Sequence, residues 1–405
     1  MSQLTHLQNG IPVILNPMNW SRLVTIVAVI ESSPRYETKE NNGISHLVEH
    51  LLFQSRPDVS AAEIADRFDA MGATYNAFTS EAVTAITITV PAENIQLAVN
   101  ELYQMITCPM AGTEEEFERQ REVILNEIRE SEDDAFHVLL TLSESTAFPG
   151  SSYSLPVAGT EESLMSITYE DTQAWKATHY GASSITISVA GGTAMPLLVH
   201  ALYRFSQWGS LAPNHKSLFE TPRYFAGGLY EPRNFGQAYV SVSYPCEGRE
   251  SEDWMSGVMV AKIVGSGMGS RLFRTIREKQ GLAYSVGTIP DIKQVGGLML
   301  NYAVTDNAEA VIESIKQIVT RVSDTLTEDE VARAKAAIKG SFLPEYEHGG
   351  KVATYAGFQY HVFRTLFEQE DFFGRIDNTT LKSIRDYAEE TFLGCSPSIV
   401  SLRPV

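Results

Sequence analysis

Two histidines and a glutamate stand close together early in the sequence, in a pattern that can hold a metal ion. They occur as His46-Leu-Val-Glu49-His50. On a helix, spacings of three and four residues place both imidazoles and the carboxylate on one face, where two imidazoles can share one zinc ion. The neighbouring residues are strongly apolar, and a buried helix does not carry three unpaired polar groups without a ligand. The pattern therefore favours a zinc site over a solvated helix face.

A catalytic zinc site needs a third protein ligand and an open position for water, so a further side chain must come from elsewhere. The helix expected over residues 113–131 offers Glu127 as this ligand. One stripe of the helix carries Gln120, Val123, Ile124 and Glu127. Because part of the stripe is apolar, we expect it to face the core and to bring Glu127 to the paired imidazoles.

With the three ligands assigned, Glu49 lies beside the zinc ion without binding it. In that position a carboxylate can take a proton from water as it attacks a peptide carbonyl, which is general-base chemistry. A structural zinc site is the competing interpretation, but such sites usually use four ligands rich in cysteine. Cys108, Cys246 and Cys395 are far apart in the sequence and form no CxxC pair. The sequence therefore predicts one catalytic zinc ion per chain.

Periodic patterns predict the elements that must position these groups. Alternating and β-branched runs indicate strands at residues 11–15 and 23–30, and two more between residues 74 and 90. Apolar residues at spacings of three and four indicate helices at residues 43–54, 61–71, 95–107 and 113–131. The last helix opens with a Thr and a Glu three positions on, which is a capping-box pattern. The two histidines thus belong to the first helix and Glu127 to the fourth.

The second half of the sequence repeats the order of the first, at an offset near 210 residues. The 405 residues are therefore expected to form two homologous α+β domains, each a largely antiparallel sheet packed with helices. The predicted boundaries are 1–209 for the zinc-binding domain, 210–222 for a linker and 223–405 for the second domain. Residues 254–265, the counterpart of the first metal helix, contain no His or Glu, and Glu127 corresponds to a position near Ser341. The second copy is therefore expected to bind no zinc.

The sequence resembles the pitrilysin-type inverted zincins, a metallopeptidase family that includes insulin-degrading enzyme and the mitochondrial processing peptidase. Members carry H-x-x-E-H followed by a metal-binding Glu some 76 to 77 residues later, and Glu127 lies 77 residues after His50. Further matching segments are spread over nearly the whole chain: 43–46, 76–79, 122–127, 155–160, 270–273 and 277–284. The chain looks like a short, bacterial-type member.

The resemblance also implies which residues bind substrate. Arg277 and Tyr284 match a family pair that contacts substrate backbone and helps to stabilise the reacting carbonyl oxygen. Asn76, Ala77, Phe78 and Thr79 look like the family's edge strand, which pairs with an extended peptide by β-augmentation. Without the resemblance, these residues would be interpreted as an ordinary helix-end Arg, a strand Tyr and a plain strand.

One position departs from the family pattern. Relatives commonly have a second Glu seven residues before the metal-binding one, and that position is Gln120 here. A neutral amide can still donate or accept a hydrogen bond, but it adds no negative charge near the ligands. Ligand orientation or metal affinity is therefore expected to differ from that of relatives that carry the Glu.

The family resemblance implies a zinc metalloendopeptidase that cleaves short unfolded peptides inside a closed chamber. Short members build this chamber by pairing two chains, so we expect a homodimer in which the first domain of one chain faces the second domain of the other. A heterodimer with a zinc-less homologue is the alternative partner. The alternative function is a non-catalytic peptide-binding or assembly subunit, although binding alone does not require Glu49 beside a metal.

Composition limits the other partners. The formal net charge of −19 argues against binding to nucleic acid or to anionic membranes. Residues 1–16 hold one short apolar run without a basic flank, so no cleaved signal peptide is expected, and no stretch is long enough to span a bilayer. Three unpaired cysteines fit a reducing compartment. We therefore expect a soluble, cytoplasmic protein.

Overall fold

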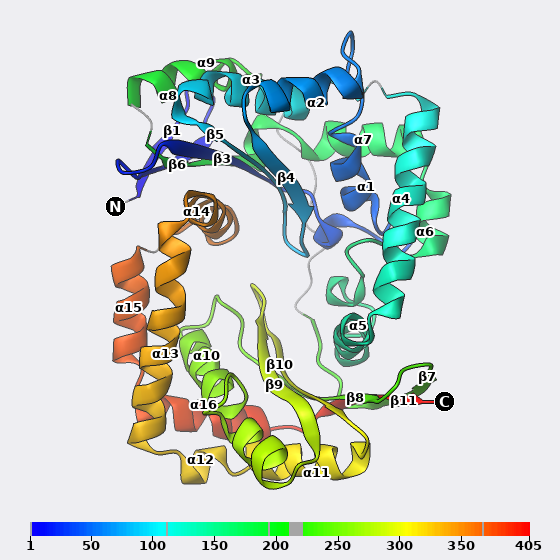
Figure 1. Ribbon diagram of the computed structural model, residues 1–405, viewed down its shortest axis with the longest axis vertical. Helices are drawn as coiled ribbons and strands as arrows, with labels where there is room; N and C mark the ends of the chain where they lie inside the picture. Colours follow the sequence, from blue (N-terminus) through cyan, green and yellow to red (C-terminus); the bar gives the residue numbers. More distant parts are fainter. Residues whose placement is uncertain (1, 111, 193–194, 210–221, 367) are drawn as a thin grey trace. The chain divides into compact units, whose positions relative to one another are not determined.

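A computed structural model describes residues 2–110, 112–192, 195–209, 222–366 and 368–405. The chain forms two compact units, each built around one β-sheet (Figure 1). The first unit comprises Met1–Arg129, Leu155–Phe219 and Leu343–Glu368, and the second comprises Glu130–Ser154, Glu220–Phe342 and Gln369–Val405. Residues 210–221 of the predicted linker lie outside the described residues, so the predicted boundaries stay a prediction.

The first unit contains a sheet with strand order β1-β2-β6-β3-β5-β4. All neighbouring strands are antiparallel except β2 and β6. The central strand β3 is buried along nearly its whole length, as its β-branched sequence predicts. The strands are β1 (Gln3–His6), β2 (Pro12–Pro17), β3 (Leu23–Ile30), β4 (Thr74–Thr79), β5 (Thr84–Pro91) and β6 (Ile185–Gly191). The predicted strand at residues 11–15 is thus found one to two residues further along.

Helices cover one face of the first sheet and bury a large apolar cluster against it. Figure 1 shows α2, α3, α8 and α9 on this side of the sheet. The helices that contribute buried residues to the cluster are α1 (Ile44–Leu51), α2 (Ala61–Ala70), α3 (Ile95–Thr107), α4 (Glu114–Asp133), α6 (Glu161–Ser166), α7 (Tyr169–His179), α8 (Met195–Ala201) and α9 (Tyr203–Ser206). This packing fixes the helices α1 and α4 that carry the predicted metal ligands.

The opposite face of the first sheet is covered by α14 (Gly349–Phe363), a helix from late in the sequence (Figure 1). Its Ala353 packs in a second apolar cluster with Val27 and Val29 of β3 and Ala85 of β5. Gly357 lies so close to the sheet that a Cβ there would meet Val29 and Ser188 at 3.0 Å. The central strand β3 is therefore buried on both sides of the sheet.

The second unit repeats this architecture. Its strand order β7-β11-β8-β10-β9 corresponds, strand for strand, to β2-β6-β3-β5-β4 of the first unit, including one parallel pair, β7 with β11. The strands are β7 (Gly228–Arg233), β8 (Ala238–Pro245), β9 (Ala283–Ile292), β10 (Gly297–Thr305) and β11 (Ser398–Pro404). The predicted fold of two homologous, largely antiparallel α+β domains is confirmed.

Helices cover both faces of the second sheet as well. One face packs mainly against α10 (Trp254–Val264), α11 (Ala308–Val319), α12 (Val322–Thr325), α13 (Glu328–Glu347), α15 (Gln369–Asn378) and α16 (Leu381–Leu393). The other face packs against α5 (Ala135–Ala147), whose Val138 and Leu139 contact Val400 and Leu402 of β11. Among the described residues, no helix is both long and apolar enough to cross a membrane.

Candidate metal centre

The helix α1 brings His46 and His50 together, as their spacing predicts. Their rings lie edge to face with centroids 4.7 Å apart. The same helix buries Leu47, Val48 and Leu51 in the core of the first unit. Because the apolar side of α1 is fixed against the sheet, the two imidazoles are held on its other side.

The N-terminus of α1 is capped by a carboxylate that the sequence analysis did not identify. The N-cap residue is Gly43, which has no side chain to accept a hydrogen bond. Instead, the buried Glu37 accepts hydrogen bonds from the backbone N–H groups of Gly43 (2.8 Å) and Ser45 (3.0 Å) and from the Asn42 amide (2.8 Å). Burial raises the pKa of Glu37, and these hydrogen bonds oppose that rise. A negative charge at this end of the helix also interacts favourably with the helix dipole.

A glycine pair fixes the same end of the helix. Gly43 has φ +94° and Gly159 has φ +79°, conformations that L side chains rarely adopt. A Cβ on Gly43 would lie 2.6 Å from the Ala158 carbonyl oxygen, and one on Gly159 would lie 2.4 Å from the Asn42 carbonyl oxygen. The two loops therefore touch through their backbones, immediately before the residues of the metal centre.

Glu127 of α4 completes a cluster of possible ligands. Its Oε2 atom lies 3.9 Å from His46 Nε2 and 3.8 Å from His50 Nε2. One ligand atom from each of the three residues lies within 4.8 Å of the others, in the only such group found among the described residues. Tetrahedral zinc ligands at their usual bond lengths are about 3.4 Å apart, so the cluster fits a zinc ion after small side-chain shifts.

Gln120 of α4 orients one of the two imidazoles. Its amide oxygen lies 3.3 Å from His50 Nδ1. An amide oxygen can only accept, so this hydrogen bond places the ring proton on Nδ1 and leaves the Nε2 lone pair for a metal. His46 differs, because its Nδ1 is buried without a hydrogen-bond partner among the described residues. Burial, with the neighbouring His50, lowers the pKa of His46 to about 4, which keeps this imidazole neutral at pH 7.

Glu49 is buried beside the cluster and held by one hydrogen bond. The residue is 6% exposed, and its Oε2 accepts a hydrogen bond from the Thr79 hydroxyl at 2.7 Å. Burial raises the pKa of Glu49; Thr79 and His50 oppose this rise, and Glu127 adds to it. Thr79 is expected from the family resemblance to bind substrate, and in the structure it also contacts the predicted base.

One detail of the prediction for α4 is wrong. Val123 was expected to face the core with Ile124 and Glu127, but it is 39% exposed, whereas Ile124 is fully buried. Each residue of an α-helix turns about 100°, so Val123 lies a quarter-turn beyond the buried side. The Glu127 side chain, 43% exposed, lies between the core and solvent. A ligand carboxylate in that place remains accessible to the ion.

The predicted substrate strand lies at an edge of the first sheet. Strand β4, with Asn76, Ala77, Phe78 and Thr79, pairs only with β5. Its outer backbone groups therefore have no partner strand among the described residues. The geometry is that of an edge able to accept another strand.

Arg277 and Tyr284 are neighbours in the second unit. The Arg277 guanidinium lies 4.2 Å from the Tyr284 ring centroid and donates a hydrogen bond to the Tyr284 carbonyl oxygen at 3.0 Å. The guanidinium also lies 4.7 Å from the ring centroid of Phe273, a residue that was not singled out from the sequence. Phe273 and Arg277 belong to the π-helical segment Phe273–Lys279, and Tyr284 follows it in the sequence. The π-helical conformation is often found at functional sites. Tyr284 is 79% exposed.

Comparison with known proteins agrees with this geometry. Residues 13–161 match the family described as "Insulinase (Peptidase family M16)", and residues 166–338 match "Peptidase M16 inactive domain". An uncharacterized zinc protease of Rickettsia felis is 29% identical over 402 residues, covering 98% of this chain and 96% of its own length. The mitochondrial-processing peptidase subunit beta of Rattus norvegicus is 25% identical, covering 100% and 85%.

A solved structure shows the same fold. A protease from Helicobacter pylori superimposes with a TM-score of 0.91 at 20% identity, covering 100% of this chain and 99% of the other. The two matched M16 segments together span most of the chain, and the second carries the name of an inactive domain, in line with the absence of His and Glu from α10. The chain belongs to the M16, or pitrilysin-type, family of peptidases.

Proposed function

We propose that the protein is a zinc-dependent endopeptidase. The observation that carries the proposal is the convergence of His46, His50 and Glu127, from two helices far apart in sequence, beside the buried carboxylate of Glu49. Two imidazoles and one carboxylate form a donor set typical of catalytic rather than structural zinc sites. A zinc ion bound there supplies Lewis acidity toward water and toward a peptide carbonyl.

The residues around the ion then have separate tasks. Glu49 takes the proton from the attacking water and passes it to the leaving amine, with its carboxylate held by the Thr79 hydroxyl. Gln120 holds His50 in the tautomer that leaves Nε2 free. Arg277 and Tyr284 bind substrate backbone and stabilise the carbonyl oxygen as it gains charge.

The proposed substrates are short unfolded peptides, enclosed in a chamber during cleavage. A peptide that pairs with the free edge of β4 is held mainly through backbone hydrogen bonds, which requires an extended segment. A folded protein cannot offer such a segment without unfolding locally. Natural substrates are therefore expected to be flexible chains or fragments.

The proposed assembly is a homodimer with two active sites, each formed by the first domain of one chain and the second domain of its partner. Mixing two inactive variants tests this arrangement. In a mixed dimer of Glu49→Gln and Arg277→Ala chains, one of the two sites receives wild-type Glu49 and wild-type Arg277. Activity should then return on mixing, toward one quarter of the wild-type level. No return of activity would instead support a site within one chain or a heterodimer with a zinc-less homologue.

The direct test is hydrolysis of a quenched fluorescent peptide, with and without a chelator. Wild-type protein should cleave the peptide, and the chelator should abolish cleavage until zinc is restored. Glu49→Gln should retain zinc but lose about 10²–10⁴-fold in rate, because it removes the general base. Peptide binding without hydrolysis by zinc-loaded wild-type protein would refute the proposal and favour a peptide-binding subunit.

A further inference from the structure

The edge strand β4 offers a bound peptide different surroundings on its two sides. Tyr75 stacks on Phe68 of α2 with ring centroids 4.1 Å apart, and Thr79 bonds to a carboxylate of α1. These side chains therefore point toward the helices of the metal centre. Because successive side chains of a strand alternate, Asn76 and Phe78 point to the other side of the sheet, where α14 lies.

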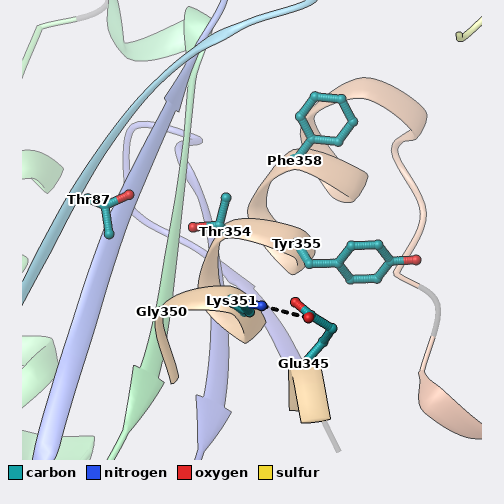
Figure 2. A pocket seen from close by; sticks show the side chains of 7 residues that line it. All are labelled: Thr87, Glu345, Gly350, Lys351, Thr354, Tyr355 and Phe358. Carbon is teal, nitrogen blue, oxygen red and sulfur yellow. Dashed lines mark hydrogen bonds and ion pairs between the residues drawn. The ribbon is translucent and has the colours of Figure 1, made fainter. Parts of the chain in front are cut away.

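A pocket of about 390 Å³ lies on that second side, between β5 and α14 (Figure 2). Thr87 lines it from β5, and Thr354, Tyr355 and Phe358 line it from α14. Thr87 is the register partner of Asn76, so the pocket begins one strand in from the free edge. We call this space the α14 pocket. Its volume is within the range of small ligand sites.

The chemistry of the α14 pocket favours an apolar guest. Figure 2 shows the two aromatic rings of Tyr355 and Phe358 on the helix and Thr354 directed toward the strand. The charged lining residues, Lys351 and Glu345, form an ion pair with each other at 2.6 Å. A charged guest would thus find no uncompensated opposite charge in this lining, whereas an apolar one would lie against the carbon atoms of Thr354, Tyr355 and Phe358.

A peptide strand on β4 can reach this space. Neighbouring strands lie about 4.8 Å apart, so the added strand is roughly 10 Å from β5. Side chains on the α14 side have only the exposed Asn76 between them and Thr87. Long aliphatic and aromatic side chains extend over the adjacent strand β4 toward the near side of this space, whereas short ones do not.

We propose that the α14 pocket receives a large apolar side chain, such as Phe, Leu or Met, from a peptide paired with β4. The proposal rests on the proposed function in one respect, the binding of peptide along this strand. It adds a rule for substrate specificity. The protein should prefer particular side chains only at alternate residues of the peptide, namely those that face α14. Residues that face the metal centre are outside the reach of this pocket.

The second unit also has a pocket between a covering helix and its sheet. A pocket of about 310 Å³ lies beside its own edge strand β9, lined by Phe136 of α5 and by Tyr284 and Ser285 of β9. The helix α5 covers the second sheet as α14 covers the first, but this pocket is lined by the edge strand itself, whereas the α14 pocket begins at β5.

The first experiment compares three proteins on a random peptide library, with cleavage products identified by mass spectrometry. Thr354→Phe fills the α14 pocket, and Thr178→Phe places the same change on the exposed side of α7 as a matched control. Peptides cleaved by wild type and by the control should contain Phe, Leu or Met about tenfold more often than Ser at one position. If two positions show this enrichment, one residue should separate them. Thr354→Phe should lose this enrichment and leave positions of the opposite parity unchanged. Unchanged preference, or equal changes at adjacent positions, would overturn the proposal.

A second measurement separates the pocket from catalysis. Metal-free Glu49→Gln protein is titrated with two fluorescent peptides that differ only by Phe or Ser at the position selected in the cleavage experiment. If no cleavage is seen there, each peptide position is compared in turn. The Phe peptide should bind about tenfold more tightly, and the added Thr354→Phe change should remove the difference. Tyr355→Ala, which opens the pocket, should also remove it and serves if Thr354→Phe fails to fold. Equal binding of all paired peptides refutes the pocket, whereas failure of wild type to cleave any peptide refutes only the proposed hydrolysis.

Discussion

Gln120 offers a way to measure how strongly one neighbouring side chain controls zinc affinity. Its amide oxygen accepts a hydrogen bond from His50 Nδ1–H, with 3.3 Å between the two heavy atoms. A neutral hydrogen bond contributes about 1 kcal/mol, and a charge-assisted one roughly twice as much. Gln120→Glu should therefore strengthen zinc binding by about 1 kcal/mol, or about fivefold in Kd. Gln120→Leu leaves the buried Nδ1–H without an acceptor and should weaken binding by about 10- to 100-fold.

Competition with a chromophoric chelator at fixed pH and ionic strength measures both changes. Gln207→Glu is the control for added negative charge, because this residue is exposed at the end of α9. Its Kd should match that of the wild type. If Gln120→Glu binds zinc no more tightly than the wild type, or if Gln120→Leu binds it equally well, the assigned hydrogen bond does not orient His50 and the reasoning fails.

Three further predictions concern stability. Glu37→Ala leaves the N–H groups of Gly43 and Ser45 without their acceptor and should lower the free energy of unfolding by about 2–5 kcal/mol in urea titrations, whereas Glu37→Gln should lose less. Burial, with the charges of Arg364 and Arg35, lowers the pKa of His361 to about 3, so its contribution to stability is present above about pH 6.5 and is lost as the pH falls toward 3. Between pH 7 and 5 wild type should therefore lose about 2 kcal/mol more than His361→Gln, and equal losses would contradict this assignment. Free zinc at 100 times its Kd should stabilise wild type by about 2.7 kcal/mol and leave His46→Ala unchanged in thermal unfolding.

Local patterns were enough to predict the elements that carry the metal centre. The helix α3 has the predicted bounds, Ile95–Thr107, and α2 ends one residue before its predicted end. The helix α1 ends at Leu51, three residues before the predicted end, because the chain turns after Leu52. These helices are amphipathic, and the spacing of their apolar residues depends only on the local sequence, so this spacing is enough to predict them.

Apart from the contact of Glu127 with the two histidines, the long-range contacts around the metal centre were not predicted from the sequence. Glu37 lies in a polar loop, and nothing in its neighbourhood shows that the chain folds back to place it at the N-terminus of α1. The strand β1 (Gln3–His6) was missed because all four of its residues are exposed, which removes the apolar alternation that reveals strands. The apolar pattern of α14 likewise does not indicate which of the two sheets this helix packs against.

The first unit includes α14 from the second half of the sequence, and the second unit includes α5 from the first half. The two halves of the chain therefore depend on each other. A polypeptide severed within residues 210–222 would leave its N-terminal piece without α14, so that Val27, Val29 and Ala85 would face water. The C-terminal piece would likewise lack α5 over β11. Each piece would be prone to aggregate when expressed by itself. The two sequence repeats therefore do not coincide with two separable folding units.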